Sequence, residues 1–136
     1  MKMKITFYGF PDNDPPSKDI AFPVIHQQAG GRGTFEDPIT AATATPENGG
    51  RFTPGTRMYV PSLQKYLIVE DSCASCSPDQ VDIWMESDER SPSEIVLKCE
   101  EAWTPDTPVE VEISPTQGRP VNTGPFFDVN SSACTI

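Results

Sequence analysis

The sequence is poor in positive charge, in histidine and in long apolar runs. It has 10 Lys and Arg residues against 20 Asp and Glu, a formal net charge of −10, and one histidine. Nucleic acids and anionic membrane surfaces attract basic proteins, so this balance argues against both as partners. No apolar run reaches the length of about 18 residues that a transmembrane helix needs, so we expect no membrane span. A neutral glycan or the basic surface of another protein remains compatible with the charge.

Proline is abundant, and it sets the class of fold. Fifteen prolines are spread over the 136 residues, and each one disfavours a helix interior at its position, which excludes long helices. The length corresponds to a single domain, 1–136. Alternating or β-rich segments bounded by turn residues predict short strands, and the fold class is therefore mainly β, as a small closed barrel. The predicted strands are 3–9, 57–60, 64–70, 81–85 and 107–115, with 38–45 as a short buried strand or half-turn.

One helix and a coil complete the expected structure. The segment 91–103 is the best helix candidate, with Ser91 or Ser93 as its N-cap and with Ile95, Val96 and Cys99 on one face. In the strand over 107–115, alternate valine and isoleucine side chains should point inward. Residues 114–136 are rich in proline and glycine, so we expect a C-terminal coil that a disulfide of Cys134 ties back.

The four cysteines predict two disulfides. An even number in a small, loop-rich chain is typical of disulfides, and a zinc site would require a second close pair of cysteines besides Cys73 and Cys76. Four cysteines allow three pairings, of which we favour Cys76–Cys99 with Cys73–Cys134. Disulfides indicate a secreted, extracellular protein, although the first residues, MKMKITFYGF, lack the apolar stretch of a signal peptide. We expect no metal and no cofactor.

An ordered set of motifs resembles the double-psi β-barrel group. TFYGF, PGTRMYV, IVEDSC and VDIWM follow one another as they do in expansins, barwin-like proteins, family 45 endoglucanases, RlpA-like lytic transglycosylases and a Streptomyces papain inhibitor. The resemblance covers roughly residues 4–113 and implies a six-stranded double-psi β-barrel with one short helix and long loops. It also places Asp71 and Asp82 where the group has its polysaccharide groove, with Tyr8 as the early aromatic residue. Gln80 stands where the group carries a histidine.

The candidate site is therefore a pair of carboxylates, Asp71 and Asp82, in a groove with Tyr8 and Trp84. Paired carboxylates can carry out glycoside chemistry as acid and as base or nucleophile. Each aspartate can instead accept backbone hydrogen bonds in a turn. Trp84 lies two residues after Asp82, on the same face of a strand, and can either stack on a sugar ring or pack in the core.

Other polar groups have simpler interpretations. The run Asp12-Asn13-Asp14 lacks the glycine and distal glutamate of a calcium loop and is better explained as a turn. His26 has no obvious partner in the sequence, which argues against a Ser-His-Asp or Cys-His catalytic group. The acidic pairs at 100–101 and at positions 110 and 112 are expected on solvated faces.

These observations leave three functions open. The resemblance implies a protein that binds or loosens cell-wall polysaccharide without hydrolysis, in the manner of an expansin, and we expect it to be a monomer. A second possibility is a cysteine protease inhibitor of the Streptomyces papain inhibitor type, which would act through rigid loops such as Asp12–Ser17 or Ser114–Pro120. A third is a lytic transglycosylase or endoglucanase-like enzyme. The protein is accordingly expected to be a binding protein rather than an enzyme, with a polysaccharide or a protease as its partner.

Overall fold

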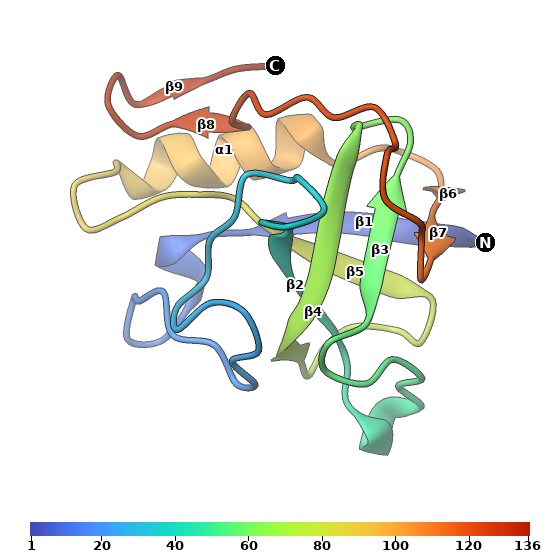
Figure 1. Ribbon diagram of the computed structural model, residues 1–136. Helices are drawn as coiled ribbons and strands as arrows, with labels where there is room; N and C mark the ends of the chain where they lie inside the picture. The colour runs from blue at the N-terminus through green and yellow to red at the C-terminus, as the bar shows by residue number, and fades with distance from the viewer.

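The computed structural model describes residues 1–136, and its main feature is a seven-stranded, nearly closed sheet (Figure 1). The sheet order is β6-β1-β5-β2-β4-β3-β7. The predicted mainly β class and small barrel are confirmed. The strands of this sheet are β1 (Lys2–Tyr8), β2 (Ile39–Ala44), β3 (Arg57–Val60), β4 (Lys65–Cys73), β5 (Gln80–Trp84), β6 (Val109–Glu110) and β7 (Glu112–Ile113). The remaining elements are the 3₁₀ turns η1 (Phe10–Asp12) and η2 (Pro46–Asn48), the helix α1 (Ser93–Trp103), and the hairpin of β8 (Phe127–Asp128) and β9 (Ala133–Cys134).

One segment closes the barrel. Strands β6 and β7 lie on either side of Val111 in a single extended stretch. β6 pairs antiparallel with β1, and β7 pairs antiparallel with β3, so the same stretch covers both edges of the sheet. The seven strands are thus six chain segments. The predicted inward face of this stretch is present: Val111 is fully buried, while Val109 and Ile113 are half-buried against the core.

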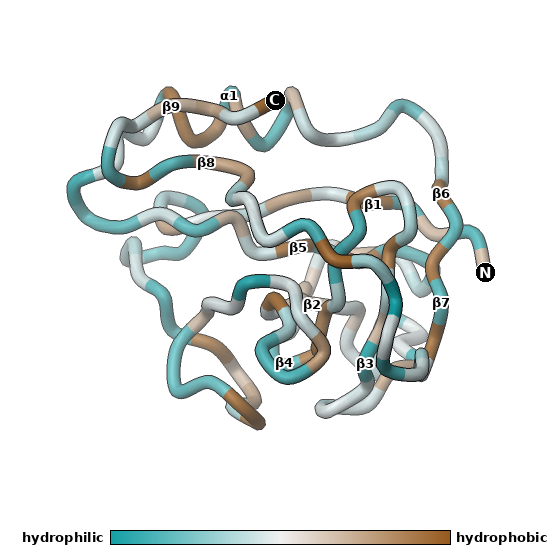
Figure 2. The backbone as a smooth tube through the Cα atoms, turned by 45° about the horizontal axis from the view of Figure 1, so that its top comes forward, coloured by the Kyte–Doolittle hydropathy of each residue, from teal (hydrophilic) through white to brown (hydrophobic).

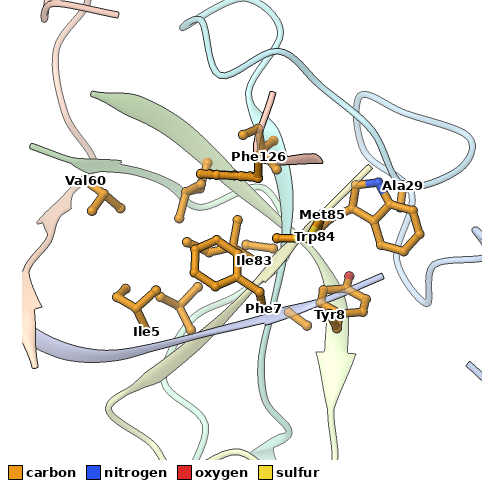
Figure 3. Packing of buried hydrophobic residues seen from close by; sticks show 14 of the residues in the cluster. Ile5, Phe7, Tyr8, Ala29, Val60, Ile83, Trp84, Met85 and Phe126 are labelled. Carbon is orange, nitrogen blue, oxygen red and sulfur yellow. The ribbon is translucent and has the colours of Figure 1, made fainter. Parts of the chain in front are cut away.

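The core fills the barrel from alternate positions of the strands. In β1, the buried residues Met3, Ile5 and Phe7 alternate with more exposed ones, and β5 runs parallel to it with Val81 and Ile83 buried. All five belong to one hydrophobic cluster, and Figure 3 shows Ile5, Phe7 and Ile83 within it. Figure 2 shows hydrophobic stretches recurring along the strands. All six residues of β2 are buried because this strand lies between β4 and β5. The region 38–45 is therefore a strand, the first of the two predicted alternatives.

Helix α1 packs against β1, with the β8–β9 hairpin along its other side (Figure 1). Val96 and Cys99 are buried, but Ile95, which we predicted on the same face, is 41% exposed. The predicted serine caps are also wrong. The N-cap is Pro92, and the Ser91 hydroxyl instead hydrogen-bonds Asp88 in the preceding turn. No helix of the structure combines the length and the apolar character that a membrane crossing needs.

The structure pairs the cysteines differently from our prediction. The disulfides are Cys73–Cys76 and Cys99–Cys134, and no cysteine is free. Cys73 and Cys76 are joined because the chain turns immediately after β4, which brings their Cα atoms to 5.3 Å. Cys99 faces the C-terminal hairpin from α1, so Cys134 is its neighbour. The expected link between Cys134 and the body of the domain is present, but residues 114–136 are not all coil, since they include β8 and β9.

A fully buried carboxylate, Glu70, anchors the long loop between β1 and β2. Its Oε1 accepts hydrogen bonds from the backbone amides of Val24, Ile25 and His26, at 3.3, 2.7 and 2.9 Å. Its Oε2 contacts His26 Nδ1 at 2.8 Å and the Thr40 hydroxyl at 2.8 Å. A buried charge is tolerated only when it is fully hydrogen-bonded, and this one meets that condition.

His26 links Glu70 to a second acid. Its Nε2 lies 2.7 Å from Asp37 Oδ1, so the lone histidine has two acidic partners where the sequence suggested none. Burial acts to lower the pKa of His26, but the hydrogen bonds to Asp37 and Glu70 outweigh it and raise that pKa. Burial likewise acts to raise the pKa of Glu70, and its hydrogen bonds outweigh it and lower that pKa. The charged forms of both groups are therefore favoured in the folded protein.

We predict that the two disulfides contribute unequally to stability. Titration in denaturant without reductant should find no thiols. Replacing Cys99 and Cys134 by serine should lower the free energy of unfolding by about 4 kcal/mol, and replacing Cys73 and Cys76 by only about 2 kcal/mol, because loop-closure entropy grows with the length of the closed loop. Urea unfolding of the two double variants measures both values. Equal losses would contradict the assignment of the main structural role to Cys99–Cys134.

We also predict that His26 makes stability depend on pH. A raised pKa means that the imidazolium stabilises the folded state fully below its ordinary pKa of 6.5, and that this contribution is lost as pH rises through the folded-state pKa. The free energy of unfolding should therefore fall between pH 6 and pH 9 by about 1–2 kcal/mol more in wild type than in His26→Gln, on the scale of a hydrogen bond to a charged group. Urea titrations across pH test this difference. Parallel curves for the two proteins would refute it.

Candidate functional site

The outer face of the β1–β5 pair carries the first part of the site. These strands are parallel, with Thr6 opposite Asp82 and Tyr8 opposite Trp84. Because side chains alternate along a strand, these four residues share the face opposite to the core residues of β1. The Thr6 hydroxyl donates to Asp82 Oδ1 at 2.9 Å, and Gln80 in turn donates to the Thr6 hydroxyl at 3.0 Å. Gln80, which stands where the resembled group has a histidine, thus holds the Thr6 hydroxyl in place.

A bulge in β4 carries the second part. The register between β2 and β4 shifts between Ala41 and Ala42, which pair with Val69 and Asp71, so that Glu70 has no partner across the ladder. An extra residue of this kind bends a strand and re-aims the side chains around it. Glu70 consequently enters the network beneath the long loop, while Asp71 faces the groove. The acidic pair at the end of this strand therefore has two separate roles.

Asp71 is held firmly by three donors. Its Oδ2 accepts a hydrogen bond from the Tyr8 hydroxyl at 2.7 Å. Its Oδ1 accepts from the backbone amides of Ala21 at 3.0 Å and Ser72 at 2.9 Å. The turn-forming role considered for this residue is thus present, together with a side-chain contact to β1. Asp71 is thus a fixed hydrogen-bond acceptor rather than a mobile group.

The two aspartates and the tyrosine meet at one open groove of about 400 Å³. Its floor is made by β1, β2 and β5, one wall by the turn after β1, and the other by the end of β4 and the Cys73–Cys76 turn. The lining residues are Phe7, Tyr8, Asp12, Asn13, Ala42, Asp71, Ser72, Cys73, Ala74, Ser75 and Asp82. The groove therefore brings together three of the four residues that the sequence predicted for it.

The electrostatics of the groove distinguish Asp82 from Asp71. Burial raises the pKa of Asp82 to about 6. The hydrogen bond from Thr6 acts to lower this pKa and offsets only part of the effect, whereas the negative charges of Asp12 and Asp71 raise it further. Burial and the adjacent carboxylate of Asp71 likewise raise the pKa of Tyr8 well above its ordinary value. Asp82 is thus the group in this groove that can take up or release a proton close to neutral pH.

A second acid with a raised pKa lies behind the groove. Glu100 of α1, which we expected on a solvated face, is buried, and its Oε2 has no hydrogen-bond partner. The pKa of Glu100 is raised to about 10. Burial is the largest cause, followed by the hydrogen bond with Asp12 and by the negative charges of Asp12 and Asp82. Gly9 allows this approach, since a Cβ there would lie 3.1 Å from Glu100 Oε2 and 2.7 Å from the Ser87 hydroxyl. Glu100 is therefore a neutral acid at physiological pH.

Trp84 does not line the groove. It is only 2% exposed, and its ring packs edge to face against Tyr8 with the ring centres 5.4 Å apart (Figure 3). Its indole nitrogen donates a hydrogen bond to Glu86. The expectation that it contributes to a binding surface is wrong, because the shared face of the strands is covered at this end by other parts of the chain. Of the two interpretations that the sequence left open, the structure supports the core residue.

The turn after β1 is formed by local hydrogen bonds. Asp12 accepts a hydrogen bond from the amide of Gly9 at 2.7 Å, and the Asn13 side chain donates to the carbonyl of Ser17 at 2.9 Å. Both side chains therefore act as turn formers, as predicted, and both also rim the groove.

Sequence reasoning missed an exposed apolar loop on the same side of the domain. Phe22, Val24 and Ile25 are 46%, 52% and 40% exposed, and Glu70 fixes the backbone beneath them. Phe22 also lines a second cavity of about 220 Å³ that ends at Asp71. The apolar run around Pro23 was visible in the sequence, but its exposure depends on the buried glutamate, which no local pattern reveals.

Comparison with known proteins identifies a family but supplies no activity. A protein of Dictyostelium discoideum, described as uncharacterized protein DDB_G0273701/DDB_G0273221, is 36% identical over 141 aligned residues, which cover 96% of this chain. The chain spans 58% of the length of that relative. No solved structure matches the chain. The model of one family, described as the DDB_G0273701 N-terminal domain, matches residues 1–135, and the chain belongs to this family.

Proposed function

We propose that the groove binds a neutral cell-wall polysaccharide without cleaving it. The observation that carries this proposal is the convergence of Tyr8, Asp71 and Asp82 on one open groove. The resemblance to the double-psi β-barrel group, in which this region binds glycans, supports it. Carboxylates accept hydrogen bonds from sugar hydroxyls, and a neutral glycan avoids the repulsion that an anionic ligand would meet in a protein of net charge −10.

Binding without hydrolysis fits the state of the two acids. Glycoside hydrolysis requires a general acid together with a second carboxylate that is free to act as base or nucleophile. Asp82, with its raised pKa, has the property of an acid, but both oxygens of Asp71 already accept hydrogen bonds. A lytic transglycosylase or endoglucanase-like activity would require Asp71 to leave these donors, and we rank it below binding.

A second candidate function is inhibition of a cysteine protease. The rigid, exposed loop with Phe22, Val24 and Ile25 favours it, because inhibitors bind tightly when a protruding loop is already ordered before binding. The Ser114–Pro120 loop is similarly fixed: the Tyr66 hydroxyl donates to Thr116 O at 2.6 Å and the Tyr59 hydroxyl to Pro120 O at 2.5 Å. We rank inhibition second, since no group on these loops indicates a particular protease.

We further propose that the protein acts outside the cell, as a monomer. Two disulfides in a chain of this size fit an oxidising compartment.

We predict that Asp82→Asn abolishes glycan binding and stabilises the fold. The variant keeps the shape of the side chain but removes a carboxylate whose folded-state pKa of about 6 lies above its ordinary 3.8. A raised carboxyl pKa makes stability fall as pH rises from about 4 to 6, so above pH 6 the substitution should raise the free energy of unfolding by up to about 3 kcal/mol. Binding isotherms on cellulose and chitin, which are neutral, should show at least a tenfold loss of affinity.

The matched control is Asp79→Asn, which removes an exposed acid outside the groove. It should bind like wild type. If Asp82 is only a turn former, Asp82→Asn will instead melt at a lower temperature and bind as well as wild type, and the glycan proposal would then be wrong.

For the inhibitor function, we predict loop-dependent inhibition of papain. Replacing Val24 and Ile25 by serine, or shortening the Ser114–Pro120 loop, should raise the inhibition constant at least tenfold through loss of apolar contact or of a rigid loop. Asp82→Asn should leave it unchanged. Leu97→Ser is the matched control, because Leu97 is an exposed apolar residue on α1. Absence of inhibition at tens of micromolar protein would rule out the papain class.

A further inference from the structure

The Cys73–Cys76 disulfide lies in the wall of the groove and is asymmetric. The two cysteines enclose only Ala74 and Ser75, in a Cys-x-x-Cys motif at the end of β4. Cys73 is half-buried and lines the groove, whereas Cys76 is only 4% exposed and does not. A molecule in the groove can therefore reach one sulfur of the bond and not the other. This is the arrangement that thiol–disulfide exchange needs: one sulfur for attack and one that leaves into a protected site.

The carboxylate of Asp82 lies directly beside this bond. One carboxylate oxygen of Asp82 and the sulfur atoms of Cys73 and Cys76 all lie within 4.8 Å of one another. A leaving thiolate in a protected site requires a proton, and an attacking thiol in the same site requires a base. Asp82 is a titratable group of the groove that lies at this bond. Its pKa of about 6 lies where a carboxyl group can both give and accept a proton near neutral pH.

Other charged groups around Asp82 are acidic. Asp71 faces it from β4 and Asp12 from η1, while Tyr8 of β1 and Glu100 of α1 contribute neutral, protonated groups. No cation among these groups stabilises a thiolate. Negative neighbours disfavour a further negative charge on sulfur, so the reduced site would hold neutral thiols, and exchange would depend on a base in contact with them.

The other disulfide differs on each of these points. Cys99–Cys134 joins residues 35 positions apart, Cys99 is 1% exposed, and the bond ties α1 to the C-terminal hairpin. A long closed loop gives a disulfide a large structural effect, whereas a loop of two residues gives a small one. Cys73–Cys76 is thus the disulfide that the fold can open at little loss.

We propose that Cys73–Cys76 is a redox-active disulfide that exchanges with a substrate dithiol, protein or small molecule, with Asp82 as the group that carries the proton of Cys76. A substrate thiolate attacks Cys73 Sγ, the bond between the cysteines breaks, and its electron pair passes to Cys76 Sγ, which takes the proton of the Asp82 carboxyl. The second substrate thiol then loses its proton and attacks the substrate sulfur of the mixed disulfide. Cys73 leaves and is protonated.

In the complete exchange, two electrons and two protons pass from the substrate dithiol to the protein. The products are one substrate disulfide and two protein thiols. The reverse sequence oxidises a dithiol protein with a substrate disulfide, and there the Asp82 carboxylate removes the proton of Cys76 before Cys76 attacks the mixed disulfide at Cys73.

The test begins with selective reduction. Dithiothreitol under native conditions, followed by alkylation and mass spectrometry, should label Cys73 and Cys76 while Cys99 and Cys134 remain unlabelled. The reduced protein is then mixed with oxidised glutathione and quenched with acid. Wild type should return to the disulfide with little mixed disulfide, whereas Asp82→Asn should accumulate glutathione on Cys73 and resolve it at least tenfold more slowly at pH 7.

Two controls make the result specific. The Cys76→Ser variant should retain glutathione on Cys73 permanently, because no second thiol can displace it. The Asp79→Asn variant removes one negative charge outside the groove and should behave like wild type. In wild type alone, the rate of resolution should rise with pH through an inflection near pH 6, a readout that requires no variant. The proposal is overturned if the two disulfides open only together on unfolding, or if Asp82→Asn resolves the mixed disulfide at the wild-type rate between pH 5 and pH 8. Neither result would affect the glycan proposal, which is read from binding.

Discussion

The buried carboxylate of Glu70 is the constraint on which the arrangement around the groove depends. It receives hydrogen bonds from three consecutive backbone amides of the long loop, from the ring of His26 and from the hydroxyl of Thr40 on β2. Each of these groups would otherwise require another partner, and a charge at a fully buried position would be severely destabilising without them. One side chain therefore fixes the position, relative to the barrel, of a long loop that contains no strand and no α-helix of its own.

The β-bulge explains how adjacent acids perform different tasks. In a regular strand Glu70 and Asp71 would point to opposite faces, and one would enter the apolar core. Because of the extra residue in β4, the Glu70 side chain instead accepts hydrogen bonds from the long loop, and the Asp71 side chain lines the groove. The same distortion lies just before the Cys73–Cys76 turn, so a single irregularity positions the loop, the acceptor in the groove and the disulfide in its wall.

Local chemistry made the barrel predictable and the site only partly so. The sequence located β1, β3 and β5 to within one residue, because β-rich composition and flanking turn residues are properties of each segment alone. It located β4 as well, but the predicted strand ended three residues too early, at position 70 instead of 73. The pairing of the cysteines, the burial of Glu100 and the exposure of Phe22 depend on which distant segments meet, and no short pattern records that. Asp71 and Asp82 were found through resemblance to a family. Trp84 was misassigned because a strand face can be covered locally even where it is open two residues earlier.

The closure of the barrel by a single stretch, 109–113, has a consequence for how the chain folds. β1 pairs with β5, which lies more than 70 residues later in the sequence, and with β6, which lies more than 100 residues later. Both edges of β1 are therefore paired only after most of the chain has been synthesised. Such distant pairings are entropically unfavourable until late, and chains dominated by them fold in roughly milliseconds to seconds rather than microseconds. During synthesis on the ribosome, the first strand therefore emerges long before its partners, with its edges open to any other strand nearby.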